Sequence, residues 1–289
     1  MKSDNSKKII EKSKLNCDYK TIRVTKSRIS KGLLAIPRGF TNYLPKSSQR
    51  IKIYLGDLQN PQIKTFSSYY SSTNENRIGG LKDWFLENHI REGDELVLQI
   101  LDKEEYMFRL IEESAFIRMT SNFQKDFDNS QDDNIASQKI ESISNLTQVD
   151  KTKIIYNEFL RLVQYSNEEI RKRIKISNRL NKEKTPSNIR IILENIYKGY
   201  CQVCSFSFLK KDNSPYYEIH HLESNLGHHP QNLVLVCANC HRQFEYANVT
   251  KILNGNGWLS KVIFNQKEYF VKQAISEIKK QDFLKTVFL

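Results

Sequence analysis

The sequence predicts an α+β protein of two domains. Residues 20–111 consist of short apolar or alternating runs separated by turn signals, the pattern of a mostly β domain. Residues 151–198 carry apolar side chains at helical spacing, and two Cys-x-x-Cys pairs follow at 201–204 and 237–240. With 289 residues, the chain is long enough for two domains that each bury a core.

Short strands account for most of the N-terminal domain, which we place at residues 15–112. The expected strands lie at residues 20–24, 32–37, 50–56, 62–66, 94–101 and 105–111. Gly, Pro, Asn and Asp residues mark the turns between them. Two short helices fit between the strands, near residues 37–44 and 81–88. The predicted architecture is therefore a mostly β barrel with two helices.

Charge is distributed unevenly along the chain, which has a formal net charge of +12. Residues 1–50 contain 13 Lys and Arg against 3 acidic residues, and residues 151–200 contain 12 against 5. Residues 103–150 reverse this balance, with 5 against 10. Such basic regions indicate a polyanionic partner. We expect residues 1–14 to form a basic tail and residues 113–150 to form a polar, acidic, solvated linker.

Cysteine use and hydropathy predict a cytoplasmic protein. Four of the five cysteines fall in the two Cys-x-x-Cys pairs, so nothing indicates a disulfide framework. No stretch approaches the roughly 20 apolar residues that a membrane-spanning helix needs. The N-terminus also lacks the apolar segment of a secretion signal. We therefore expect no membrane contact.

The two Cys-x-x-Cys pairs predict a structural Zn²⁺ site. Each pair presents two thiolates from one tight turn, and the two pairs complete a closed tetrahedral site. The ligands are Cys201, Cys204, Cys237 and Cys240. The 32 residues between the pairs exceed the usual zinc-finger interval, so they should form a small folded element. Structural zinc is common both in nucleases and in DNA-binding modules, so the cysteines alone leave both classes open.

The segment around these cysteines resembles the HNH nuclease family, in particular its zinc-stabilised, McrA-like branch in restriction enzymes. The resemblance covers about residues 200–248 and rests on His220-His221, on Asn232 and on His241 directly after the second cysteine pair. It implies a ββα-metal core, a hairpin and a helix pinned by zinc around a divalent catalytic ion.

This core would lie within a nuclease domain at residues 151–289. Residues 151–198 form its expected helical lead-in. An amphipathic helix is expected within about residues 267–286, from the spacing of Val271, Ala274, Ile275 and Ile278. Packing of that helix against its own domain and use as a dimer face both remain open.

The family resemblance assigns a role to each motif residue. His221 corresponds to the general base, and His220 and His241 correspond to ligands of the catalytic metal. Asn232 corresponds to the asparagine that holds the loop positioning the base. A neutral imidazole is suited to take a proton from an attacking water, and a divalent ion to stabilise charge on the phosphate. Successive strand side chains alternate between faces, so the adjacent histidines should have different roles.

Residues near these motif positions allow several readings. We expect Mg²⁺ or Mn²⁺ as the catalytic ion. Two imidazole ligands favour Mn²⁺ over Mg²⁺, which prefers oxygen ligands. Glu218 faces the same side of its strand as His220, so it either orients a ligand imidazole from the second shell or is solvated. His228 and His229 stand where relatives have a Gly-Gly turn. A solvated loop is the expectation there, with extra ligands or phosphate contacts as the alternative.

The N-terminal domain resembles the DNA-binding pseudobarrel of plant B-three-type transcription factors and of EcoRII-like effector domains in restriction enzymes. The resemblance rests on residues 36–38, 80–85 and 92–97 and on the order of strands and helices. In that family two loops grip the major groove, and they correspond here to residues 25–32 and 66–78. The side chains expected to contact phosphates or base edges are Lys26, Ser27, Arg28, Lys31, Asn74, Asn76 and Arg77.

Together these features predict a sequence-specific, restriction-type HNH endonuclease that acts on double-stranded DNA. Its fold class is α+β with two domains, a β pseudobarrel with two short helices followed by helices and a ββα-metal core with a four-cysteine zinc site. One HNH site cuts one strand, so a homodimer on a palindromic target is the simplest route to a double-strand break. A cognate DNA methyltransferase is a further expected partner. The alternatives are a modified-cytosine-dependent HNH endonuclease and a non-catalytic, zinc-containing DNA-binding regulator.

Overall fold

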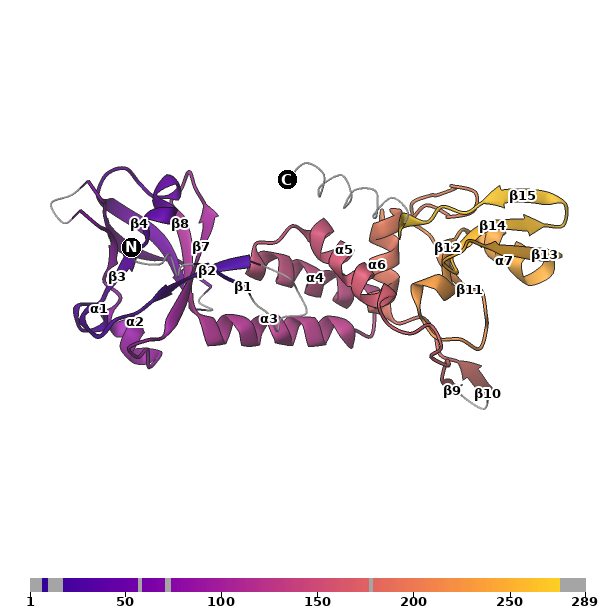
Figure 1. Cartoon of the computed structure of the whole chain (residues 1–289), viewed down its shortest axis with the longest axis horizontal. Helices are drawn as coiled ribbons and strands as arrows, with labels where there is room; N and C mark the ends of the chain where they lie inside the picture. Colours follow the sequence, from indigo (N-terminus) through magenta and orange to yellow (C-terminus); the bar gives the residue numbers. More distant parts are fainter. Residues whose placement is uncertain (1–6, 10–17, 57–58, 71–73, 177–178, 276–289) are drawn as a thin grey trace. The chain divides into compact units, whose positions relative to one another are not determined.

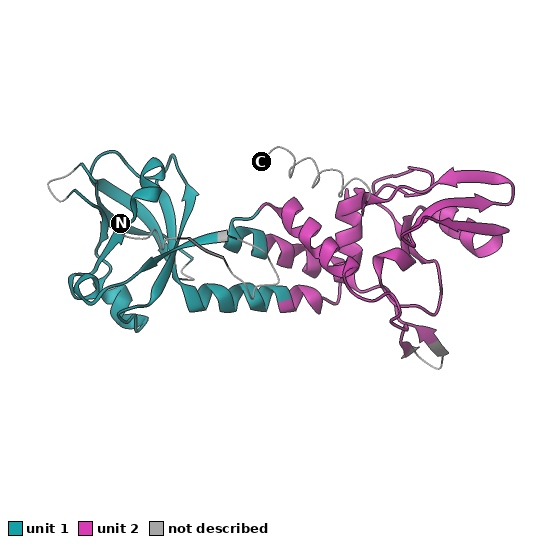
Figure 2. Ribbon diagram, viewed as in Figure 1, with its two compact units in different colours: residues 1–124, 143–149 teal, residues 125–142, 150–289 magenta. Residues whose placement is uncertain are grey.

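The computed structural model describes residues 7–9, 18–56, 59–70, 74–176 and 179–275. The chain divides into two compact units, coloured separately in Figure 2. Unit 1 comprises residues 1–124 and 143–149, and unit 2 comprises residues 125–142 and 150–289. Within the described ranges, no helix is both long enough and apolar enough to cross a membrane.

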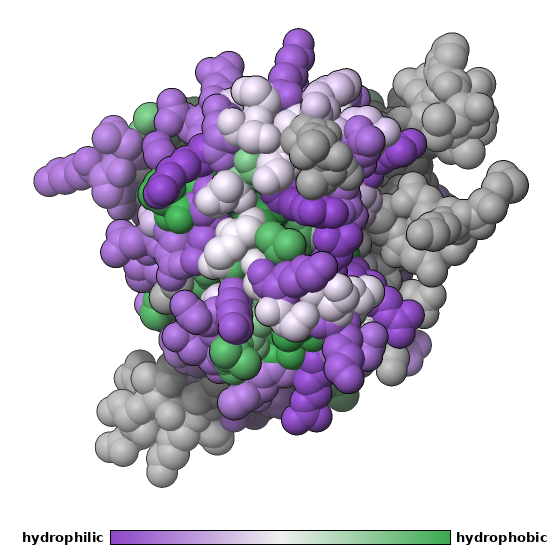
Figure 3. Space-filling model, turned by 90° about the vertical axis from the view of Figure 1, so that its left-hand side faces the viewer, coloured by the Kyte–Doolittle hydropathy of each residue, from purple (hydrophilic) through white to green (hydrophobic). Residues whose placement is uncertain are grey.

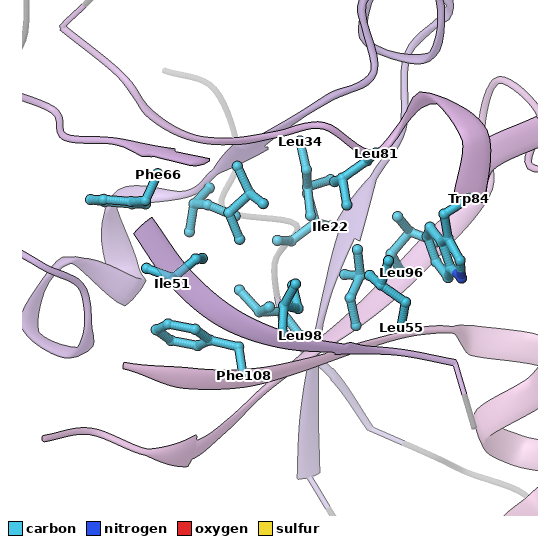
Figure 4. Packing of buried hydrophobic residues seen from close by; sticks show 14 of the residues in the cluster. Ile22, Leu34, Ile51, Leu55, Phe66, Leu81, Trp84, Leu96, Leu98 and Phe108 are labelled. Atoms are coloured by element: carbon cyan, nitrogen blue, oxygen red, sulfur yellow. The ribbon is translucent and has the colours of Figure 1, made fainter. Parts of the chain in front are cut away.

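Unit 1 is built on an eight-stranded sheet in the order β1-β2-β7-β8-β4-β5-β6-β3 (Figure 1). The strands are β1 (Lys7–Ile9), β2 (Asp18–Arg23), β3 (Leu33–Ile36), β4 (Gln49–Leu55), β5 (Gln62–Ser67), β6 (Asn76–Gly79), β7 (Glu95–Asp102) and β8 (Met107–Glu112). Neighbouring strands are antiparallel except β4 and β8, which run parallel. The sheet curls around one apolar core to which Ile51, Phe66, Leu98 and Phe108 contribute (Figure 4). The predicted mostly β barrel is confirmed.

Three short helices accompany this sheet: α1 (Lys26–Lys31), the 3-10 helix η1 (Arg38–Tyr43) and α2 (Lys82–Glu87). The latter two are the helices that the sequence predicts, whereas residues 26–31 were expected in a loop. Gly32 ends α1 with φ of 60°, and a Cβ there would lie 2.7 Å from the backbone N of Lys82. The glycine therefore both supplies the left-handed conformation and lets α1 end against α2.

The expectation of a solvated linker at residues 113–150 is wrong. This segment forms α3 (Glu113–Asp128) and α4 (Asp133–Thr147). Phe116 and Leu146 pack in an apolar cluster of unit 1, while Phe127 and Ile140 are fully buried in unit 2. The few apolar residues recur at helical spacing, so each helix buries a narrow stripe although its average composition is polar.

The expected basic tail at residues 1–14 is wrong in part. Lys7–Ile9 form β1, which pairs antiparallel with β2. Residues 1–6 and 10–14 lie outside the described part of the chain.

The predicted helical lead-in of unit 2 contains α5 (Lys151–Val163) and α6 (Ser187–Tyr197). Between these helices the chain forms an antiparallel hairpin of β9 (Arg173–Ile176) and β10 (Arg179–Lys182), which the sequence analysis did not anticipate. Alternating residues over so few positions give too weak a strand signal to compete with the flanking helical pattern.

The core of unit 2 is a hairpin followed by a helix. Strand β11 (Glu218–His221) pairs with β12 (Leu233–Val236), and α7 (Ala238–Tyr246) follows. The short 3-10 helix η2 (Pro230–Asn232) lies between the strands in sequence. This arrangement confirms the predicted order of hairpin and helix.

A three-stranded sheet completes unit 2, with β13 (Val249–Leu253), β14 (Leu259–Phe264) and β15 (Lys267–Phe270). The predicted helix at 267–286 is therefore wrong at its start, because residues 267–270 pair with β14 instead. Residues 274 and 275 are helical, so the helix begins after β15. Residues 276–286 lie outside the described part of the chain.

The face of unit 1 shown in Figure 3 is mostly hydrophilic, and hydrophobic side chains appear there as small areas among polar ones. Such a surface is typical of a protein face in contact with water or with a polar, charged partner.

Candidate active site

Four cysteine thiols of unit 2 converge on one point. The Sγ atoms of Cys201, Cys204, Cys237 and Cys240 all lie within 4.8 Å of one another. The Cys204 and Cys237 sulfurs are 3.6 Å apart, close to the edge of about 3.8 Å expected for a ZnS₄ tetrahedron with Zn–S bonds of about 2.3 Å. The donor set and the spacing therefore suit a metal ion that prefers four thiolates.

Local backbone geometry prepares this cluster. The N–H of Cys204 donates to the sulfur of Cys201 at 3.5 Å, and the N–H of Ser205 donates to the carbonyl of Cys201 at 2.8 Å. Cys237 precedes α7 and Cys240 lies in its first turn. The cluster thus ties the turn after α6 to the start of the helix that carries His241.

Strand β11 separates the two adjacent histidines. The ring of His220 stacks on Phe244 of α7, with centroids 4.2 Å apart and planes at 16°. The ring of His221 lies beside that of His228, with centroids 5.2 Å apart. The alternation of strand side chains therefore gives each histidine its own environment.

His220 and His241 lie together on the α7 side of the strand. Their ring centroids are 5.4 Å apart. Glu245 stands one helical turn after His241, and its Oε1 lies 3.9 Å from Nε2 of His241. Residues i and i+4 share a helix face, so Glu245 adds a carboxylate beside the two imidazoles. The sequence analysis missed Glu245, although its spacing from His241 was a signal for it.

Glu218 links Tyr216 to His241. Its Oε2 lies 2.5 Å from Nδ1 of His241, and its Oε1 accepts a hydrogen bond from the hydroxyl of Tyr216 at 2.5 Å. A carboxylate in this position holds the imidazole ring in one orientation and leaves Nε2 as its available nitrogen. Of the two readings of Glu218, the solvated one does not fit these contacts.

His228 contacts His221 on the other side of β11. Nε2 of His221 lies 3.1 Å from Nδ1 of His228, and Nε2 of His228 lies 3.9 Å from Oε2 of Glu183. Only 12% of the His228 side chain is exposed, so the expectation of a solvated loop is wrong at this position. Nδ1 of His221 is left as the nitrogen that can face a substrate.

Asn232 fastens the loop between the two histidines. Its Oδ1 accepts from the N–H of Glu223 at 2.8 Å, and its Nδ2 donates to the carbonyls of Glu223 and Gly227 at 3.1 and 3.0 Å. The side chain is buried. The amide thereby closes residues 223–227 into one loop, the structural role that the sequence indicates for this residue.

His229 is also not solvated, which corrects the expectation for the second histidine of this loop. It is buried, and its Nε2 lies 3.3 Å from the carbonyl of Val163. Its Nδ1 accepts a hydrogen bond from the N–H of Gln231 and so caps η2. These contacts give His229 a structural role.

Both motif histidines are held in the neutral form. Burial, together with the nearby positive charge of Arg171, lowers the pKa of His221 to about 3. Burial likewise lowers the pKa of His220 to about 4, assisted by His241 and Lys251. A neutral imidazole has the free lone pair that proton acceptance or metal binding requires. A bound phosphodiester would counteract the shift, because an anion nearby favours the protonated ring.

In unit 1, the two expected DNA-contacting segments meet at Glu75. Arg28 of α1 donates to both carboxylate oxygens of Glu75 at 2.7 and 2.8 Å, and Arg77 of β6 donates at 2.7 Å. Burial raises the pKa of Glu75, but the hydrogen bonds from the two arginines outweigh it and leave the pKa below its ordinary value. The contact holds two guanidinium groups side by side.

The remaining expected contact residues of unit 1 differ in exposure. Lys26, Ser27, Lys31 and Asn74 are exposed. Asn76 is buried, and its Oδ1 accepts a hydrogen bond from the N–H of Tyr69 at 2.5 Å. The expectation that Asn76 reads a base edge is therefore wrong, because its amide oxygen holds its own loop.

Comparisons with known proteins locate one family in this chain. Residues 201–245 match the model of the HNH endonuclease family. Among curated proteins, none matches the chain. Solved structures similar to it include an Arabidopsis FUS3-DNA complex, 13% identical over 32% of this chain and 92% of that one, with a TM-score of 0.27. They also include the N-terminal domain of Helicobacter pylori LlaJI.R1, 15% identical over 32% and 78%, with a TM-score of 0.24. The match to the HNH endonuclease family covers the segment that contains the four cysteines, β11, β12 and nearly all of α7.

Proposed function

We propose that the chain is a sequence-specific, restriction-type endonuclease that hydrolyses phosphodiester bonds of double-stranded DNA. The observation that carries this proposal is the division of roles on β11, with His221 on one side and His220 beside His241 and Glu245 on the other. A binding module has no need for this arrangement. The non-catalytic alternative is therefore disfavoured.

The cluster of four thiolates would hold a structural Zn²⁺ ion. His220, His241 and Glu245 would hold the catalytic Mg²⁺ or Mn²⁺ ion, and Glu218 would orient His241. A bound divalent ion supplies stabilisation of the charge on the phosphate and on the leaving oxygen. Two neutral imidazoles supply no negative charge to the ion. The carboxylate of Glu245 would supply one anionic oxygen ligand.

His221 accepts a proton from the attacking water. Nε2 of His221 faces His228, so the accepting lone pair must lie on Nδ1. Nε2 of His221 then carries a hydrogen and donates it to Nδ1 of His228. The hydrogen of His228 lies on Nε2, 3.9 Å from Oε2 of Glu183, which is too far for a hydrogen bond. The contact with His228 holds the general base in the productive tautomer.

Replacing His228 by alanine is therefore expected to lower kcat by about 10- to 100-fold, the usual effect of removing a group that orients an active-site ligand or base. His228→Asn should recover part of the loss, because an amide oxygen can accept the hydrogen bond from His221. Nicking of supercoiled plasmid under single-turnover conditions measures both variants. Equal rates for alanine and asparagine, at wild-type zinc content and melting temperature, would contradict the positioning role.

Sequence selectivity is assigned to unit 1. Arg28, Arg77, Lys26 and Lys31 offer cations from two neighbouring segments, and the paired guanidinium groups suit bidentate contacts with guanine. An HNH site that grips the backbone needs such a partner for specificity. One site cuts one strand, so double-strand cleavage requires two chains, most simply a symmetric homodimer. A methyltransferase that modifies the same target would protect host DNA.

Purified full-length protein should nick or linearise plasmid DNA only when Mg²⁺ or Mn²⁺ is added, and EDTA should stop the reaction. Sequencing the ends should show a shared sequence around the cuts. Substrates with and without cytosine methylation separate a restriction enzyme that methylation blocks from a nuclease that requires it. Binding without cleavage under every metal condition would instead support a DNA-binding regulator.

A further inference from the structure

The β9–β10 hairpin is the most strongly basic segment of unit 2. Residues 171–184 contain seven Lys and Arg and one acidic residue. The side chains of Lys172, Arg173 and Lys184 are exposed, and within the described residues they form no ion pair. These three residues are the hairpin cations. Most exposed cations on a protein are simply solvated. A binding role for these three therefore depends on where the hairpin lies relative to the HNH site.

The hairpin is fastened to the loop that follows His221. Nζ of Lys182 donates to the carbonyl of Ser224 at 2.6 Å and to Oδ1 of Asn225 at 2.7 Å. The N–H of Arg171 donates to the carbonyl of Asn225 at 3.0 Å. This loop runs from the proposed general base to its partner His228. The hairpin therefore has a fixed position beside the reacting centre.

A glycine allows this close attachment. The N–H of Gly227 donates to the carbonyl of Glu169, just before the hairpin. A Cβ at Gly227 would lie 2.8 Å from that carbonyl oxygen, closer than real Cβ contacts come. Only glycine lets the loop of the histidines and the base of the hairpin approach so closely.

The register of the hairpin places like charges opposite each other. Arg173 pairs directly with Lys182. Like charges in such a pair repel and destabilise a sheet, and a two-stranded hairpin has little stability of its own. An anion lying along the hairpin would relieve this repulsion. The arrangement is thus unfavourable for the free protein and favourable in contact with a polyanion.

We infer that the β9–β10 hairpin is a second DNA-binding element, whose exposed cations contact backbone phosphates next to the bond that the HNH site cleaves. The inference rests on the proposed function, since it names a further DNA contact of the same unit. The three hairpin cations lie together at the base of the hairpin, where β9 begins and just after β10 ends. DNA presents one phosphate per about 3.4 Å of helix axis on each strand, so a group of three cations can meet two or three phosphates.

The test is the salt dependence of DNA binding by the full chain carrying His221→Ala, which is expected to cleave DNA much more slowly than the wild-type protein. The triple variant Lys172→Gln, Arg173→Gln, Lys184→Gln is expected to reduce the slope of log K against log salt by about two to three units, since each phosphate contact contributes about 0.9. The loss should be the same for every DNA sequence, because phosphate contacts carry no base information. These three residues make no described contact that the substitutions would break.

The matched control removes the same charge elsewhere in unit 2, at the exposed Lys153, Lys198 and Lys211. Its slope should stay within half a unit of the parent, because none of these lysines belongs to the hairpin or to the loop that the hairpin contacts. An unchanged slope in the hairpin variant, or an equal drop in the control, would overturn the inference while leaving the nuclease proposal intact. A reduced slope in the hairpin variant, together with a wild-type protein that cleaves DNA under no metal condition, would uphold the hairpin contact and refute the proposed function.

Discussion

The His221→Ala variant is expected to nick DNA about 10²- to 10⁴-fold more slowly than the wild-type protein, because a positioned general base usually contributes this factor. DNA affinity and zinc content should stay near wild type. His221 is not part of the cysteine cluster, and its described polar contact is with His228. Single-turnover plasmid nicking measures the rate, and a gel-shift titration measures the affinity.

Substitutions on the other side of β11 provide the comparison. His220→Ala and His241→Ala should raise the concentration of Mn²⁺ needed for half-maximal activity, because each removes a proposed metal ligand. His221→Ala should leave that concentration unchanged and lower only the plateau. Wild-type turnover in His221→Ala would remove the residue from the proton-accepting role. Identical metal titrations for wild type and both ligand variants would show that the metal lies elsewhere.

The second large effect is expected from the cysteine cluster. Cys240→Ser should abolish folding of the hairpin and helix of unit 2, because a structural zinc ion contributes on the order of 10 kcal/mol in small zinc domains. The Cys240 side chain is buried, and β12, α7 and β14 share an apolar core with the cysteines. Elemental analysis should find one zinc ion per chain in wild-type protein and none in the variant.

Cys17→Ser is the matched control, since it makes the same substitution at the cysteine outside the two pairs. It should retain zinc, secondary structure by circular dichroism, and nicking activity. Fully active wild-type protein without zinc would contradict the structural role of the cluster. A Cys240→Ser variant that melts at the wild-type temperature would do the same.

The sequence was most informative where the signal is local. The two cysteines of each pair lie three positions apart in one turn, and the two adjacent histidines lie on one short strand. Such short spacings can be recognised without knowledge of the tertiary fold. Six of the eight described strands of unit 1 were predictable for the same reason, because apolar alternation and turn residues mark each of them separately. The other two, β1 and β6, lie in segments that were expected to be a tail and a loop.

Contacts between distant residues were not predictable. Glu183 and His228 are 45 positions apart, and only the attachment of the hairpin to the loop brings their side chains to 3.9 Å. The same limit applies to Arg28 and Glu75, which meet because α1 and the segment before β6 converge. The polar average of residues 113–150 concealed two helices, because burial of a stripe needs only about one residue in three or four to be apolar.

The boundary between the two units crosses both α3 and α4, which affects proteolysis and the exchange of one unit for another. The chain leaves unit 1 after residue 124, returns at residue 143 and leaves again after residue 149. Leu146 packs with Tyr19 and Val97, and its carbonyl accepts a hydrogen bond from Gln99. A protease that cuts once near residue 124 would therefore leave a C-terminal piece that still carries part of the unit 1 fold. Exchange of unit 1 between such proteins would require two matched junctions, and a single splice point would leave one unit incomplete.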